Sequence, residues 1–197
     1  MSKKEAILQA ATSLFARKGF KDAGMSEISR MTGAAEGTIF YHFKNKEDLF
    51  LSILERLKED IVREFEHYLK EAEFGTGLEM LEGVVTFYLS LAGKMDDRFL
   101  LLHRHEAYEL ARENATCKAH LEAIYECLID VYERAITRGQ EDGSVDRDGV
   151  PARKSAMIIF SMVDGLVRLN TYELYDAGSL YNELIEVCRR IAGSRPS

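Results

Sequence analysis

The sequence predicts an all-α protein of about nine helices, and three observations support this. Apolar residues recur three and four residues apart along almost the whole chain, whereas the alternation typical of strands is nearly absent. Only two prolines occur in 197 residues, so long helices can run without interruption. Because 46% of the residues are hydrophobic, the helices can enclose a proper core.

The first helix has clear start and stop signals. Ser2, with Glu5 three residues later, forms a capping box, and Gly19 predicts the end of the helix. Between these signals Ile7, Ala11, Leu14 and Phe15 form one core-facing stripe. Two short helices are expected next, at about 25–32 and 36–43.

A long helix follows, and Asn45 with Asp48 predicts its start. It is expected to end near Phe74, where glycines interrupt the pattern. Pro151 suits the first turn of a later helix, since its missing N–H has no partner there to lose. The remaining helices are expected at about 77–93, 97–113, 116–139, 151–173 and 178–192.

Residues 24–43 have the layout of a helix-turn-helix, with two short helices around a glycine-containing turn. Ile28, Met31, Ile39 and Phe43 are spaced to pack this pair against the first helix. The second helix then presents small and hydrogen-bonding side chains outward, which suits a DNA major groove. An ordinary three-helix core with a polar face would give the same spacing. The outward residues are Glu36, Gly37, Thr38, Tyr41 and His42.

The run Gly37-Thr38-Ile39-Phe40-Tyr41-His42-Phe43-Lys44-Asn45-Lys46-Glu47-Asp48-Leu49 resembles the signature of the tetracycline-repressor (TetR) family. The first helix also resembles that family, through Ile7-Leu8, Ala10-Ala11, Leu14-Phe15 and Gly19-Phe20. The resemblance implies a DNA-binding domain at 1–61 and a ligand-binding and dimerisation domain at 62–197. It implies a homodimeric repressor that binds a near-palindromic operator and is released by a small molecule.

The resemblance also implies individual DNA contacts. Gly37 and Thr38 would lie at the groove floor, and Tyr41, His42 and Lys46 would contact phosphates. Glu36 and Lys44 complete the expected DNA-facing set. Three positions depart from the family pattern: Gly24 and Ala35 lack the usual capping hydroxyl, and Phe40 cannot donate a hydrogen bond to a phosphate.

The last two helices are apolar on two sides, which predicts two packing partners for each. One side can face the core of the domain and the other a second subunit. Burial of both sides within a monomer is the alternative. The family forms its dimer interface from these two helices, and the expected interface residues are Val163, Val167, Leu184 and Val187.

Helices 77–93, 97–113, 116–139 and 151–173 are expected to line a mostly apolar effector pocket. An apolar or amphipathic effector, anionic or neutral, would suit it. Residues of these types are more often plain core than ligand lining. Arg104 could receive a carboxylate or, alternatively, be a solvated charge or an inter-helix salt-bridge partner. The candidates are Tyr88, Arg104, Tyr108, Tyr125 and Cys127.

Charge and motifs narrow the class of protein. The net charge is −7, but residues 1–50 hold eight basic against six acidic side chains, so one end is slightly basic. No phosphate loop, HExxH or GxSxG occurs, so an enzyme is not expected, and no cofactor or metal site is expected either. Three cysteines without CxxC spacing, and no signal peptide or membrane helix, indicate a cytoplasmic protein. A helical adaptor that binds only protein is the remaining alternative.

Overall fold

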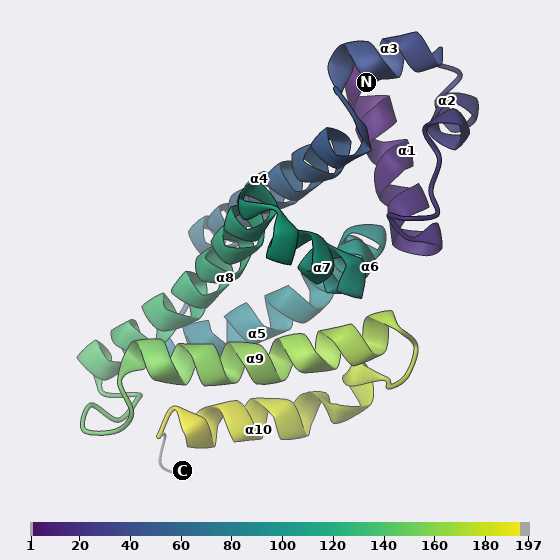
Figure 1. The fold of residues 1–197 in the computed structure, drawn as a ribbon. Helices are drawn as coiled ribbons and strands as arrows, with labels where there is room; N and C mark the ends of the chain where they lie inside the picture. The colour runs from purple at the N-terminus through teal and green to yellow at the C-terminus, as the bar shows by residue number, and fades with distance from the viewer. Residues whose placement is uncertain (1, 194–197) are drawn as a thin grey trace. The chain divides into compact units, whose positions relative to one another are not determined.

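The computed structural model describes residues 2–193 and is all-α in this range (Figure 1). It contains ten α-helices and one short 3₁₀ helix, η1, within the described residues. Their bounds are α1 Lys3–Lys18, α2 Met25–Thr32, α3 Glu36–His42, α4 Lys46–Glu71, α5 Gly77–Lys94, α6 Asp96–His103, α7 His105–Glu113, α8 Ala115–Asp142, α9 Ala152–Thr171, η1 Ala177–Leu180 and α10 Tyr181–Ile191.

The chain folds into two compact units. The head unit comprises the described residues up to Ile61 together with Met95–Ile124, and the body unit comprises Val62–Lys94 together with the described residues from Tyr125 onward. The helices α4 and α8 therefore each contribute residues to both units. The head unit holds α1 to α3 and also α6 and α7, which the sequence analysis assigned to the larger domain.

Local capping signals place the helix ends as expected. The Ser2 hydroxyl accepts a hydrogen bond from the Glu5 N–H at 3.1 Å, and α1 ends at Gly19 with a φ of 97°. At the start of α4, the Asn45 side chain accepts from the Asp48 N–H at 2.7 Å. Each cap satisfies a backbone group that has no partner inside its helix, so it marks the boundary locally.

The expected helix 97–113 is wrong as a single element, because the chain is extended at Arg104 (φ −68°, ψ 139°) and divides it into α6 and α7. The Arg104 side chain makes contacts outside its own helix, which compensate for the interrupted backbone ladder. The guanidinium donates to the carbonyl oxygen of Ala16 and to the carboxylate of Glu106. Tertiary contacts from α1 thus favour a break that the residue pattern does not indicate.

The head core consists of α1, α2 and α3 with the start of α4. Ile28, Ile39 and Phe43 are almost fully buried, as their spacing predicted. Met31, which was expected to join them, is 51% exposed, so that assignment was wrong. The helix α2 has only eight residues, and Ile28 is its single buried residue, so Ile28 alone packs into the head core.

In the body unit, α5 packs against α9 and α10, and the last two helices lie side by side (Figure 1). The start of α5 also approaches α8 very closely. A Cβ atom built on Gly77 would lie 2.0 Å from the backbone nitrogen of Gly139. The Gly77 N–H donates to Asp142 at 2.6 Å, and the next N–H donates to Ser144 at 3.1 Å. Two glycines are therefore required where these helices meet.

Candidate nucleic-acid interface and effector site

The helix α3 presents a continuous exposed face. Ile39 is fully buried and anchors the helix, whereas Tyr41 is 84% exposed. Glu36, Gly37 and Phe40 are also exposed, and Thr38 and His42 are half-buried. These are the residues expected to face DNA, with Phe40 added to the set. A helix that is anchored by a single side and otherwise open can enter a major groove about 12 Å wide.

The turn between α2 and α3 is held by short-range hydrogen bonds. Gly33 adopts the left-handed conformation with a φ of 67°, which glycine reaches without strain. The Ser29 hydroxyl donates to the Ala34 carbonyl oxygen at 2.7 Å. At the other end of α2, the Glu27 carboxylate accepts from the Gly24 N–H at 3.0 Å. The α2 start thus lacks a capping hydroxyl but is capped by its own third residue.

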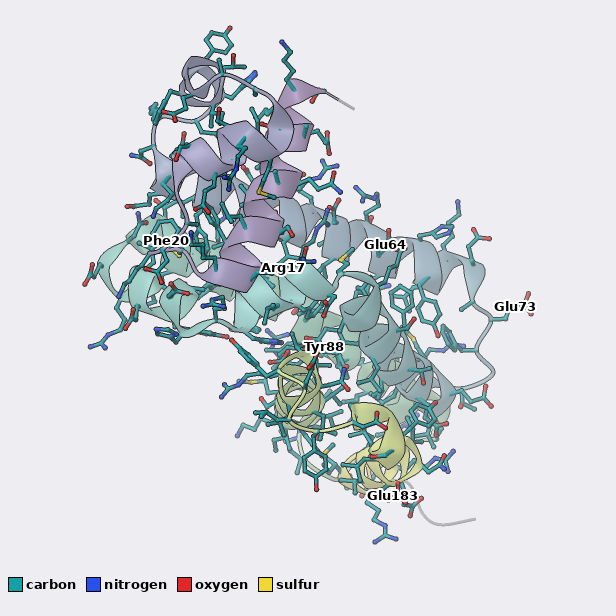
Figure 2. The ribbon with its side chains drawn as sticks, turned by 90° about the vertical axis from the view of Figure 1, so that its right-hand side faces the viewer. Arg17, Phe20, Glu64, Glu73, Tyr88 and Glu183 are labelled. Atoms are coloured by element: carbon teal, nitrogen blue, oxygen red, sulfur yellow. The ribbon has the colours of Figure 1, made fainter. Side chains whose placement is uncertain are left out.

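Lys46, an expected phosphate contact, already has partners within the head unit. Its Nζ donates to the carbonyl oxygens of Lys21 at 3.0 Å and Ala23 at 3.1 Å. It also lies 4.8 Å from the centre of the Phe20 ring, in the segment that follows α1 (Figure 2). An ammonium group has three N–H donors, so one remains for a phosphate oxygen. Lys44, by contrast, is exposed.

Arg104 belongs to an ion-pair network at the end of α1. Its Nε lies 2.7 Å from a carboxylate oxygen of Glu106, and its Nη1 donates to the Ala16 carbonyl oxygen at 2.9 Å. The other Glu106 oxygen accepts from the Lys21 N–H at 3.2 Å. Burial alone would raise the pKa of Glu106, but these hydrogen bonds outweigh it and lower the pKa. The Arg104 guanidinium thus forms a local salt bridge to Glu106 and a hydrogen bond to the backbone of α1.

Two of the expected pocket residues meet around one aromatic ring in the body unit. The ring centres of Tyr88 and Tyr125 lie 5.7 and 6.1 Å from that of Phe160. The Tyr88 hydroxyl donates to Asp164 at 2.5 Å, and burial raises its pKa. Tyr88, labelled in Figure 2, is fully buried in this cluster, and Cys127 is half-buried on α8. Arg104 and the exposed Tyr108 are not part of it, because they belong to the head unit.

A cavity of about 730 Å³ lies elsewhere in the body unit, and none of the five expected pocket residues lines it. One wall is apolar and comes from the end of α4, the loop after it and the start of α5. The other wall is one charged face of α8. The sequence signal that could have found this wall is the run of polar residues at helical spacing on α8. The lining residues are Leu69, Ala72, Phe74, Met80, Asp130, Glu133, Arg134, Thr137, Arg138 and Glu141.

The last two helices each have a buried and an exposed apolar side. Val163, Val167 and Leu184 are at most 4% exposed, because they already pack inside their own body unit. They are therefore unavailable to a second subunit, and their assignment to an interface needs correction. Val187 is 39% exposed and remains available. The exposed apolar face of α9 contains Met157, Ile158 and Leu169, with Ser161 and Gly165 between them.

Comparisons with known proteins agree with this geometry. Residues 7–53 match the family described as "Bacterial regulatory proteins, tetR family". The chain is 26% identical to the fatty acid metabolism regulator protein of Bacillus subtilis over 183 residues. This alignment covers 92% of the chain and 91% of the regulator. The regulator QacR of Staphylococcus aureus is 41% identical over 54 residues, which are 27% of this chain and 29% of QacR.

The fold is shared with solved structures over nearly the whole chain. The transcriptional regulator FadR from Bacillus subtilis, in complex with stearoyl-CoA, superposes with a TM-score of 0.77 and 24% identity, covering 97% of this chain and 99% of FadR. Residues 7–53 therefore match the DNA-binding region of the TetR family. With this region and an exposed α3 face, the protein is a DNA-binding transcriptional regulator.

Two other features of the chain bear on alternative chemistries. Residues 2–193 contain no group of three side chains placed to hold a metal ion, and none of their helices is both long and apolar enough to cross a bilayer. Burial raises the pKa of the Cys117 thiol to about 11 and that of Cys188 to about 12. Both thiols therefore stay protonated at neutral pH, which disfavours a redox switch through them.

Proposed function

We propose that the protein binds a near-palindromic operator as a homodimer and is released from it by a small amphipathic molecule. The observation that carries this proposal is the exposed face of α3, anchored by Ile39 alone. Glu36, Gly37 and Thr38 would read base edges there. Tyr41, His42 and Lys44 would contact phosphates, and the remaining N–H donor of Lys46 would bind a further phosphate oxygen.

The exposed apolar face of α9, extended by Val187 on α10, supports the homodimer. Met157, Ile158 and Leu169 are between 37% and 52% exposed, and an apolar surface of this kind marks an interaction site. Ser161 and Gly165 between them would allow two helices to approach closely. Because a two-fold dimer presents two identical recognition helices, its operator should contain two half-sites about one helical turn, or a multiple, apart.

The effector class is supported by the relatives. One is a fatty acid metabolism regulator, and one solved structure of similar fold holds stearoyl-CoA. We infer that the effector here is also an acyl compound, which is amphipathic. The protein would act by binding alone, without catalysis, and in the cytoplasm, where its DNA partner is.

The test starts with selection and sequencing of duplexes bound by the purified protein. We expect a near-palindromic site, and we expect Tyr41→Ala to weaken binding about tenfold, since one charge-assisted contact is lost. Tyr108→Ala is the matched control, because Tyr108 is an exposed tyrosine of the head unit outside α3. Equal affinity of the Tyr41→Ala variant, or selection of no common sequence, would contradict the proposal.

A further inference from the structure

The 730 Å³ cavity of the body unit has two chemically opposite walls. Leu69, Ala72, Phe74 and Met80 make one wall. The other is a single polar face of α8, from Asp130 to Glu141, with side chains three and four residues apart. The volume lies within the range of about 300–1,000 Å³ that is usual for small-molecule sites. An apolar surface facing a charged one suits a ligand that is itself amphipathic.

Two of the three carboxylates on the charged wall are already ion-paired. Arg153 of α9 donates to Asp130 at 2.5 Å and to Glu133 at 2.8 Å, and it also pairs with Glu126. A ligand cation would have to displace a guanidinium that has three carboxylate partners. Hydrogen bonds between charged groups are stronger than neutral ones, so Asp130 and Glu133 are poorly available to a ligand. Glu141 is the remaining carboxylate on the wall.

The arginines of the wall are more available than its acids. Arg134 has no hydrogen bond or ion pair within the part of the chain that the structure describes. Arg138, one turn further along α8, donates from one nitrogen to the Phe74 carbonyl oxygen at 2.6 Å. Each guanidinium has five N–H donors, so most of the donors on both arginines remain free to bind an anion.

We propose that this cavity binds an anionic amphiphile, an acyl chain whose carboxylate or phosphate group contacts Arg134 and Arg138. The chain would lie against Leu69, Ala72 and Met80. The inference rests on the proposed function only in taking this ligand as the effector. A head group on Arg138 would compete with the Phe74 carbonyl oxygen and so act on the loop that follows α4. The wall requires an anion joined to an apolar chain, so neither part alone is a sufficient ligand.

The experiment measures dissociation constants by calorimetry for oleate, stearoyl-CoA and free coenzyme A. We expect the wild type to bind at least one acyl compound and to bind free coenzyme A at least tenfold more weakly. Oleate and stearoyl-CoA distinguish a carboxylate head group from a phosphate one. The Arg134→Gln, Arg138→Gln double variant should lose at least tenfold in affinity. Arg134→Lys in place of Arg134→Gln should recover part of this loss. The matched control is Arg112→Gln, an exposed arginine on α7.

The results separate this inference from the proposed function. Unchanged affinity of the double variant, or no binding of either acyl compound by the wild type, overturns the cavity as the site. If the double variant still releases DNA with the ligand as the wild type does, the site is elsewhere and the proposed function stands. If the wild type binds the ligand and the double variant does not, the site is supported. If the wild-type complex with the operator nevertheless persists in the presence of the ligand, the effector role is overturned. Melting curves of all variants without ligand check that they are folded.

Discussion

In the head unit, the side chains offered to DNA all come from the segment 36–46, whereas the walls of the body-unit cavity come from residues 69–80 and 130–141. The head surface is therefore built by one short helix and its flanking turns. The cavity exists only where two distant segments meet. This difference explains why a residue pattern can indicate the first surface and cannot indicate the second.

Charged groups also differ in use between the two units. In the head unit, Lys46 binds carbonyl oxygens of the segment between α1 and α2, and Arg104 binds a carbonyl oxygen of α1. In the body unit, Arg153 pairs with carboxylates, and Arg134 has no hydrogen bond or ion pair to any of residues 2–193. A basic residue near a predicted site can therefore be a ligand contact or a structural support, and only its partners distinguish the two roles.

The largest expected effect separates the two faces of α9. Ile158→Asp should give a folded monomer, because a charge on an interface residue weakens association by at least about thirtyfold. Val163→Asp should instead unfold the body unit, since Val163 is fully buried and an unpaired carboxylate there is strongly destabilising. Sedimentation velocity and circular dichroism measure both outcomes. A dimeric Ile158→Asp protein would place the interface elsewhere.

The glycine contact in the body unit gives the next largest effect. Gly77→Ala should destabilise the protein by about 1–3 kcal/mol or more, because its Cβ would overlap the backbone of Gly139. Gly93, in the same helix, has open space around it, and Gly93→Ala should stabilise by up to about 1 kcal/mol. Urea denaturation of both variants tests the pair. Equal stability would mean that α5 and α8 do not meet closely.

The roles of two lysines in the head unit can be separated in one experiment. Lys46→Met should lower the free energy of unfolding by about 1.5–3 kcal/mol, since hydrogen bonds from a charged group are lost. Lys44→Met should leave stability unchanged and reduce the salt dependence of DNA binding by about one unit. Binding isotherms at several salt concentrations provide the slopes. A stable Lys46→Met protein with the reduced slope would make Lys46 a phosphate contact only.

The Glu106 network predicts a dependence of stability on pH. The pKa of Glu106 is lowered in the folded state, so its contribution is present above the ordinary value of 4.5 and is lost as pH falls through the lower folded value. Glu106→Gln should cost about 1–3 kcal/mol at pH 7, and its deficit should shrink below pH 4.5. The exposed Glu109→Gln control should change stability little. A deficit that is constant with pH would contradict the ion pair.

The smallest expected effect concerns the start of α3. Ala35 precedes the helix without a side-chain hydrogen bond, so Ala35→Ser should stabilise the protein by about 0.5–2 kcal/mol. Ala119→Ser, at an exposed position inside α8, should instead destabilise slightly, by about 0.5 kcal/mol. Thermal melting distinguishes the opposite signs. A lower melting temperature for the Ala35→Ser variant would contradict the capping role.

Short-range features were predictable from the sequence alone. Ser2 and Gly19 mark the ends of α1, and Asn45 marks the start of α4, because a cap depends on groups within about four residues. The exposed face of α3 follows from the same local periodicity, with Ile39 buried and Tyr41 exposed. These features therefore do not depend on contacts with distant segments.

The tertiary structure alone decided the features that depend on distant partners. The break at Arg104 needs the Ala16 carbonyl oxygen, 88 residues away in the chain. Both faces of α9 contain large apolar residues, and packing in the body unit determines that Val163 is buried and Ile158 exposed. The cavity requires α4, α5 and α8 to leave space between them. Residue periodicity shows that a face is apolar or charged, but only the assembled neighbours determine what that face contacts.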